Sequence, residues 1–457
     1  MSLLDSPEAL ALLEEAIVPI EVVIGCQKDL VPFLKRFLPL FYRGEQRELA
    51  TVVIAGKLSG LQRKTSEPIA IQAQRHRKPV QHFVGAGAWD DEAVMAEVRR
   101  HVDEELSDAS GVLVVDGSAF PKKGAESCGV DRQWCGRLGK LENCQVGVFI
   151  GYAGRDGHAP LDRRLYLTED WANDRQRREK CHVPVEVVFQ EKWRIGLDLL
   201  ERCRDVQHGW IAADDEFGRV TAFRQALRQR RERYVVDVPG NTLLRELHFI
   251  DGHKTRFERV DAWAARQPSS RWQKITIRPG EKGELVVRAL TALVQTKDED
   301  HRVGRPERAL VMRPITTSGD ASYALSNALS DVSLAELVRV KSERHRIEEL
   351  FQEGKGEVGL AHYEVRSWVG WHHHMTLSML ALWFLSLERW RWGEKGTRPH
   401  RAPAPTDHDP APPERPYSSL HYRSDKPNHA SQRRSPHLSL AQKHRQVSAA
   451  SSSGRRT

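Results

Sequence analysis

The pattern of apolar and polar positions divides the chain into a helical first part and a mixed second part. Up to about residue 105, apolar residues recur three or four positions apart, as on one face of a helix. Basic side chains lie between them, and they suit either contact with a phosphate backbone or, more commonly, a solvated surface. Two apolar series carry the pattern: Phe33, Phe37, Leu38 and Phe41, then Leu49, Val52, Val53 and Leu58 before Gly60.

Short apolar runs replace this pattern from Gly111 onward. The β-branched run 112–115 predicts a strand, and 145–152 and 163–167 predict two more, with Gly and Pro in the turns between them. Three consecutive strands of this kind are typical of an antiparallel meander. A helical pattern follows over 185–203.

The next segments alternate between strand and helix. We predict a strand over 209–213, a helix over 220–231 and a strand over 234–238, the order of a βαβ unit that adds parallel strands to the sheet.

From 244 to 314, short apolar runs again alternate with turn residues, which predicts a β-rich insertion in the larger domain. Ser333 and Glu336 have the spacing of a capping box, so a helix is expected to begin there. A last apolar helix is predicted over 371–390. Beyond 393 the chain is rich in Pro, Ser, Arg and His and too poor in apolar residues to order itself.

The net charge changes this picture little, because the tail carries all of it. The chain has a formal charge of +8, and the residues from 395 onward hold twelve Lys and Arg against four Asp and Glu. The rest of the chain is formally neutral, so any contact with nucleic acid requires basic side chains gathered on one face.

Cysteine usage and the termini point to a cytoplasmic protein. The six cysteines, including Cys26, form no CxxC pair, so we favour reduced thiols over a zinc site. The first residues show no basic-then-apolar signal segment, and no apolar stretch is long enough to span a membrane.

Three acidic residues are the main candidates for chemistry. Asp116 and Asp214 each follow an apolar strand, and Glu348 lies in a charged helical stretch. Mg²⁺ prefers carboxylate oxygens and substrate phosphates, so two strand-end aspartates and a helical glutamate suit a two-metal phosphoryl-transfer site. Asp215 and Glu216 are rivals of Asp214, which is nearest its strand.

Basic residues accompany these acids. Arg344, Glu348, Phe351 and Lys355 are spaced to share one helical face, which places a carboxylate between two cations that can grip phosphates. Lys122 and Lys123 follow Asp116 closely and suit either DNA contact or a plain surface.

Taken together, these segments resemble the DDE transposases of bacterial insertion sequences, in the branch whose glutamate lies in a Tyr, Arg, Glu, Lys signature. The similarity runs from about 33 to 387 and is carried by three catalytic segments and the helices that close them. The matching residues are Asp116 with Ser118 and Lys123-Gly124, the string Asp214 to Gly218, Arg344, Glu348 and Lys355, then Gly359-Leu360, Tyr363 to Arg366 and His374 to Leu377.

One position departs from the signature. Lys341 stands where the tyrosine three residues before Arg344 is expected. A lysine can grip phosphate differently from a tyrosine, so the role of that position is in doubt while the three acids are untouched.

The resemblance implies an α/β fold with a ribonuclease H-like catalytic core, a β-rich insertion and a preceding helical domain. We expect a helical DNA-binding or assembly domain over 1–105, the core over 106–243 and 319–393, the insertion over 244–318, and a basic disordered tail over 394–457.

The implied activity is metal-dependent cleavage of DNA at the ends of the element and transfer of the 3′ hydroxyl to target DNA. Asp116, Asp214 and Glu348 would hold two Mg²⁺ ions, or Mn²⁺, and Lys123, Arg344 and Lys355 would bind DNA. The expected partners are DNA with terminal inverted repeats, target DNA and a second copy of the chain, in the bacterial cytoplasm at the nucleoid. The alternatives are an inactive DNA-binding derivative or repressor, and a repair nuclease on the same fold.

Two other groups of residues have simpler explanations. Adjacent residues on a helix point about 100° apart, so His372 to His374 do not form a metal site. The tryptophans near the last helix are expected to pack in the core.

Overall fold

The computed structural model describes residues 20–247, 256–280, 283–298, 300–315 and 321–392, which belong to one compact unit. The predictions for the first residues and for the tail 394–457 lie outside these ranges, as does the side chain of Cys26. No helix in the described part is long and apolar enough to cross a membrane.

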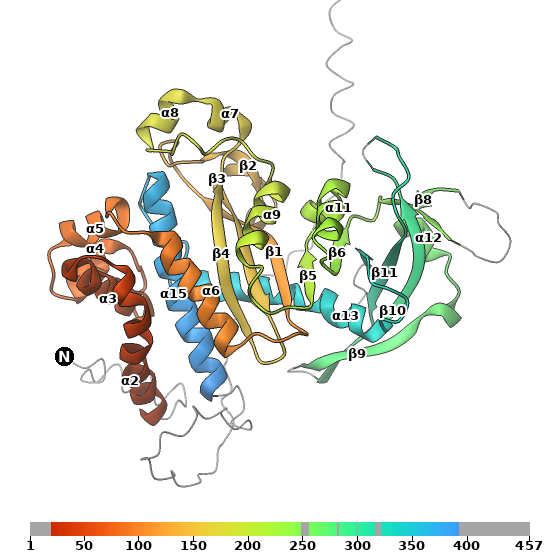
Figure 1. The fold of residues 1–457 in the computed structure, drawn as a ribbon, viewed down its shortest axis with the longest axis horizontal. Helices are drawn as coiled ribbons and strands as arrows, with labels where there is room; N and C mark the ends of the chain where they lie inside the picture. Colours follow the sequence, from red (N-terminus) through yellow and green to blue (C-terminus); the bar gives the residue numbers. More distant parts are fainter. Residues whose placement is uncertain (1–19, 248–255, 281–282, 299, 316–320, 393–457) are drawn as a thin grey trace, which may run out of the picture. The chain divides into compact units, whose positions relative to one another are not determined.

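Helices form where the first part of the sequence predicts them, and the C-terminal helix packs among them (Figure 1). Helix α15, which runs through the predicted 371–390, contacts α3, α5 and α6. Its buried Trp383 donates a hydrogen bond of 3.0 Å to His101 of α6. The bounds are α2 Ile20–Phe37, η2 Leu38–Leu40, α3 Gly44–Leu58, α4 Ser66–Gln72, α5 Arg77–Ala86, α6 Asp91–Glu105 and α15 Trp368–Trp392.

The predicted antiparallel meander is confirmed. Strand β3 (Lys140–Ala153) pairs with β1 (Val112–Pro121) on one side and with β4 (His158–Tyr166) on the other, antiparallel in both cases. A short strand that the sequence analysis did not predict, β2 (Asp131–Cys135), also pairs with β3.

The predicted βαβ unit adds two parallel strands beyond β1. Strand β5 (Trp210–Ala213) pairs parallel to β1, and β6 (Tyr234–Val238) pairs parallel to β5. Between them lie α10 (Asp215–Gly218) and α11 (Thr221–Gln229). The carboxyl ends of β1, β5 and β6 therefore meet at one edge of the sheet.

The strands that form within the predicted β-rich insertion continue the same sheet, together with β12, which lies beyond its predicted end at 318. Strand β12 pairs antiparallel with β6, and β11, β10, β7 and β8 follow in that order, with β9 paired to β10. In the described ranges the sheet has 12 strands. The bounds are β7 Leu243–Glu246, β8 Glu258–Arg259, β9 Gln273–Gly280, β10 Gly283–Thr296, β11 Glu307–Pro314 and β12 Ser322–Ser326.

Helices cover both faces of the first part of the sheet. Helix α9 (Lys192–Arg202) packs on one face, where a Cβ on Gly196 would lie 3.0 Å from Val115. Helix α14 (His345–Gly356) packs on the other, with Ile347 and Leu350 against Gly151 of β3. Shorter helices complete the set: α7 Glu169–Asn173, α8 Arg175–Lys180, η3 Gly136–Leu138, α12 Val260–Ala265 and η4 Ser269–Arg271.

One helix prediction needs correction. The pattern over 185–203 forms a helix only from Lys192, and Val185 and Val188 are exposed before it. The helical stretch predicted around Glu348 is confirmed as α14, which Arg344 caps, and a separate helix, α13 (Leu334–Glu343), ends just before Arg344. Arg344 therefore occupies the junction between the two helices.

The capping box predicted at the start of α13 forms only in part. Ser333 accepts a hydrogen bond of 3.1 Å from the backbone of Glu336, as expected. The Glu336 carboxylate accepts instead from Trp210 of β5, at 3.0 Å, and from Arg339. This contact ties α13 to the strand that precedes Asp214.

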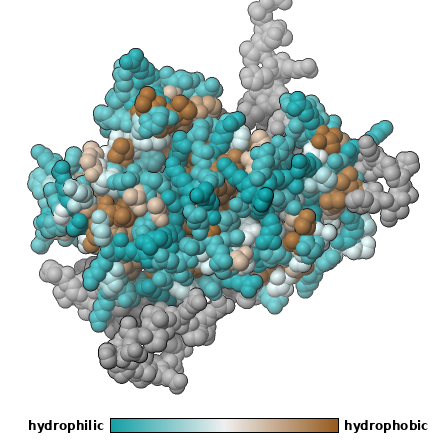
Figure 2. Space-filling view, in the orientation of Figure 1, coloured by the Kyte–Doolittle hydropathy of each residue, from teal (hydrophilic) through white to brown (hydrophobic). Residues whose placement is uncertain are grey.

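Apolar side chains are scattered over the described surface. The face seen in Figure 2 is mainly hydrophilic, with separate hydrophobic patches. Among the most exposed apolar side chains are Tyr42, Val185 and Leu329, which are far apart in the sequence. Scattered apolar residues of this kind need no special explanation.

Candidate active site

Three aspartates stand in one row at the ends of three neighbouring parallel strands. In the strand register Val115 is level with Ala213, and Ala213 with Val236. The next residue along each strand is Asp116, Asp214 or Asp237. Side chains at one level of a sheet point to the same face, so the sequence-predicted pair Asp116 and Asp214 is brought together, and Asp237 joins it.

Asp116 is buried, with 8 % of its surface exposed, although it carries a carboxylate. Its Oδ1 accepts a hydrogen bond of 2.6 Å from the backbone of Gly117. Burial, followed by repulsion from Asp214, raises the pKa of Asp116 well above its usual value. A cation close to Asp116 would stabilise the ionised form of its carboxyl group.

Asp214 is fixed by the helix that follows it. Its Oδ1 accepts from the backbone of Glu216 at 3.0 Å and of Phe217 at 3.4 Å, and so caps the N-terminus of α10. Burial is the first cause that raises the pKa of Asp214, to about 7, with the charges of Glu216 and Asp215 adding to it.

The two rivals of Asp214 are engaged elsewhere. Asp215 pairs with Arg219 at 2.6 Å, and Glu216 pairs with Lys192 of α9, also at 2.6 Å. A Cβ on Gly117 would lie 3.7 Å from Glu216. Gly117 faces the side of β1 opposite to Asp116, because neighbours on a strand alternate, so Glu216 lies behind the site.

Glu348 is joined to the aspartates through Arg344. One guanidinium group lies 2.8 Å from Glu348, 3.2 Å from Asp237 and 3.8 Å from Asp116. His345 also contacts Glu348, at 3.0 Å, and this hydrogen bond is the largest of the causes that lower the pKa of Glu348. Two of the sequence-predicted acids, Asp116 and Glu348, therefore share one cation with Asp237, and Asp214 acts on that cation only through its charge.

Lys341 has a role that the sequence analysis left open. Its Nζ donates a hydrogen bond to the Asp237 carboxylate, and both side chains are largely buried. Asp237 thus pairs with two cations, Lys341 from α13 and Arg344 from the junction. The sequence analysis missed Asp237, although it follows the apolar run 234–236 as Asp116 follows 112–115.

The other predicted DNA-binding residues, Lys355 and Lys123, lie on α14 and just beyond the end of β1. Lys355 of α14 donates a hydrogen bond of 2.8 Å to Ser118, which shares a face of β1 with Asp116. Lys123 is exposed, and seven residues of mostly extended chain place it about 20 Å from Asp116, so it does not join the acid group. Its neighbour Lys122 lies 3.3 Å above the ring of Tyr363.

The histidine run is buried and bonded to backbone. His372 contacts the Trp368 carbonyl at 2.9 Å, His373 that of Trp89 at 3.1 Å and His374 that of Leu360 at 3.1 Å. Each points to a different neighbour, as the helical spacing predicts. The described cysteines are free thiols.

No group of three or more His, Cys, Asp or Glu side chains in the described part of the chain is close enough to hold a metal ion as it stands. The Arg344 guanidinium lies among the acids instead. The arrangement is a cluster of carboxylates, with Asp116 buried and Glu348 at the surface, whose charge is partly balanced by Arg344.

Comparison with known families agrees with this geometry. Residues 36–284 match the family described as DDE superfamily endonuclease, and 194–384 match the transposase DDE domain. The chain belongs to the DDE superfamily. The predicted resemblance to the DDE transposases of insertion sequences is confirmed. Enzymes of this superfamily use divalent metal ions.

A relative supports the same assignment. The DDE chain is 31 % identical over 242 residues to a protein of Microchaete diplosiphon named as a probable transposase for the insertion sequence element IS701. The match covers 50 % of this chain and 59 % of that relative, less than two thirds of its length.

Proposed function

We propose that this protein is an insertion-sequence transposase that cleaves DNA at the element's ends and transfers the 3′ hydroxyl to target DNA. The observation that carries the proposal is the row of Asp116, Asp214 and Asp237 at one sheet edge, with Glu348 linked to it through Arg344. Four carboxylates brought to one side of the sheet suit phosphoryl transfer better than any other chemistry these residues offer.

We also infer a ribonuclease H-like core. The strand order β4, β3, β1, β5, β6, with an antiparallel meander followed by two parallel strands, supports it. The division into a helical domain over 1–105, a core over 106–243 and 319–393 and an insertion over 244–318 remains part of this proposal.

Asp116, Asp214 and Glu348 are the residues proposed to hold the metal, which we expect to be two Mg²⁺ or Mn²⁺ ions. The raised pKa of Asp214 and Asp116 fits this role, because buried carboxylates lacking enough nearby positive charge favour a cation. Bound divalent ions would activate the attacking oxygen and stabilise the leaving one.

The chain's own residues supply position and charge. Asp214 is oriented by capping α10, and Asp116 by the buried strand that it ends. If Glu348 held a metal ion, Arg344 would lose that partner but keep Asp237, and its guanidinium would be placed to contact a DNA phosphate. Lys355, beside Ser118, is placed to contact the next part of the DNA backbone.

The test is cleavage of DNA that carries the terminal inverted repeats, with Mg²⁺ or Mn²⁺. Asp116→Ala, Asp214→Ala and Glu348→Ala should each abolish cutting and leave DNA binding intact. Normal cleavage by any one of them would contradict the assignment. Cutting of DNA without repeats would favour a repair nuclease.

A DNA-binding derivative without activity is the second candidate. It is favoured by one observation, that Lys341 replaces the signature tyrosine and, together with Arg344, neutralises Asp237. Binding to repeat ends with no nicking under either metal would support it. For the active transposase we expect two copies of the chain to act together, because two element ends must be joined.

A further inference from the structure

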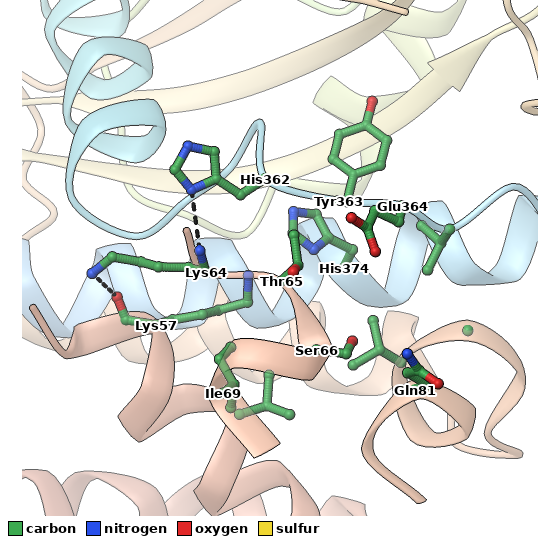
Figure 3. A pocket seen from close by; sticks show the side chains of 14 residues that line it. Lys57, Lys64, Thr65, Ser66, Ile69, Gln81, His362, Tyr363, Glu364 and His374 are labelled. Carbon is green, nitrogen blue, oxygen red and sulfur yellow. Dashed lines mark hydrogen bonds between the residues drawn. The ribbon is translucent and has the colours of Figure 1, made fainter. Parts of the chain in front are cut away.

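A second polar site lies between the N-terminal helices and the segment that precedes α15. It is a cavity of about 280 Å³. Figure 3 shows Lys57 of α3 extending into it from below and His374 of α15 facing it from above. Thr65 and Ser66 add hydroxyl groups, and Tyr363 closes one side.

The cavity contains a lysine that is buried without a counter-charge. Lys57 is 1 % exposed, and its Nζ donates a hydrogen bond of 2.8 Å to Ser378. Within the described ranges, no carboxylate lies within ion-pairing distance of Lys57 or of its neighbour Lys64. The Lys64 ammonium donates to the carbonyl oxygens of Lys57 and Ser59 at the end of α3.

The surroundings add little negative charge. His362 and His374 line the cavity with pKa values lowered by burial, Lys122 lies 3.3 Å from the ring centre of Tyr363, and Glu357 acts on Lys64 only through its charge. The nearest acid on the lining is Glu364, which pairs with Arg63 at 2.5 Å. The cavity as a whole is therefore short of negative charge.

This shortage affects the titration of the buried groups. Burial, and then the charge of Lys64, lowers the pKa of Lys57 to about 7. Burial also lowers the pKa of Lys122 to about 8 and that of His374 well below its usual value. Buried charges in proteins are normally paired, so a cluster of this kind is incomplete without an anion.

We propose that this cavity binds a phosphate group, held by the Lys57 ammonium and by the hydroxyls of Thr65 and Ser66. A phosphate supplies the missing negative charge and several acceptor oxygens, and its hydrogen bonds to an ammonium are charge-assisted. The cavity volume is ample for one such group.

The position of the cavity indicates one source of the phosphate. Asp116, Ser118 and Phe120 alternate along β1 and share one face, which lies buried beneath α14 and leads from the acid cluster to Tyr363. Tyr363 in turn contacts His374, with ring centres 4.9 Å apart. Because these contacts lie in the core, DNA does not follow them, but the backbone of a DNA that extends beyond the acid cluster is one source of the phosphate, and this part rests on the proposed function. Free phosphate or a nucleotide is the other source.

The test is NMR of the full chain with ¹³C at the lysine Cε atoms, titrated with inorganic phosphate. Phosphate should move the titration midpoint of Lys57 to higher pH. The Lys57 signal is assigned by its loss in Lys57→Met, or, if that variant does not fold, by its shift in Ser378→Ala. Phosphate affinity should fall at least about tenfold in Lys57→Met, because one charge-assisted contact is removed. Lys274→Met, at an exposed lysine of β9, is the matched control and should leave the affinity unchanged.

A second arm separates the two sources. A short DNA duplex that displaces inorganic phosphate from Lys57 identifies the DNA backbone, whereas phosphate binding that DNA does not displace identifies a free phosphate or nucleotide. A Lys57 signal that responds neither to millimolar phosphate nor to DNA overturns the proposal. Phosphate binding remains measurable if the chain proves unable to cut DNA, so failure of one proposal does not imply failure of the other.

Discussion

The Nε atom of Arg344 lies 3.2 Å from the carboxylate of Asp237, a residue in the same row as Asp116 and Asp214. Arg344 reaches Glu348 and Asp116 with its other nitrogens. Asp237 is thus the anchor for the cation that sits among the candidate metal ligands. Four predictions follow from contacts of this kind.

Asp237→Asn should keep the fold but weaken DNA cleavage roughly 10- to 100-fold, the usual cost of losing a group that orients a metal site. Lys341 and Arg344 both lose their charged partner in this variant. Cleavage rates at several Mg²⁺ concentrations measure the effect, and tighter competition by Arg344 for Glu348 should raise the Mg²⁺ needed. Asp205→Asn, at an exposed aspartate, is the control. An unchanged Mg²⁺ dependence would show that Asp237 has no positioning role.

Asp214→Asn and Asp215→Asn should behave very differently. Asparagine caps a helix as well as aspartate does, so Asp214→Asn keeps the start of α10 and removes only the negative charge. We expect cleavage to fall by at least about 10³-fold in this variant and to change by only a few-fold in Asp215→Asn. Circular dichroism checks that both remain folded. Equal loss in the two variants would mean that the acid was chosen wrongly.

Lys355→Met should weaken DNA binding at every sequence and reduce the slope of log affinity against log salt by about 1, as for the loss of one phosphate contact. Binding measured over a range of salt concentrations gives the slope. Ser118→Ala removes the hydrogen bond of Lys355 but keeps its charge, so its slope should match that of the unchanged chain. A slope unaffected by Lys355→Met would place Lys355 outside the DNA contact.

Lys57→Met should change how stability depends on pH. The pKa of Lys57 is lowered to about 7 by burial, so between pH 7 and the usual lysine pKa the unfolded chain binds the proton and the folded chain does not. Stability of the unchanged chain should therefore rise over this range by roughly 3 kcal/mol relative to Lys57→Met, in phosphate-free buffer. Urea unfolding at pH 7 and pH 10 measures it.

The same comparison for Lys274→Met should show a constant difference at both pH values, because Lys274 is exposed. If the difference in stability between Lys57→Met and the unchanged chain is also the same at pH 7 and pH 10, burial does not lower the pKa of Lys57.

The local pattern predicted much of the fold because strands and helices here are set by nearby residues. The run 234–238 forms β6 over Tyr234–Val238, as expected, and Ser333 caps α13. The break at Arg344 could not be predicted from helical spacing, since Arg344 and Glu348 pair as neighbours on one helix would.

The sequence predicted three acids of the candidate site but not the fourth, Asp237. The strand-end position that singled out Asp116 and Asp214 applies equally to Asp237, yet no signature in the sequence draws attention to it. Its pairing with Lys341 depends on the approach of α13 to β6, which are about a hundred residues apart. The Lys57 cavity depends on similar long-range packing between α3 and α15.

The backbone hydrogen bonds between β6 and β12 have a mechanical consequence. Residues 235–238 of β6 pair with 323–326 of β12, so the strand that carries Asp237 also joins the first part of the sheet to β12, β11, β10, β7 and β8. Those strands cannot rotate about a hinge without breaking the hydrogen bonds between β6 and β12. Bending of bound DNA against them would therefore reach the acid cluster as an elastic twist of one continuous sheet.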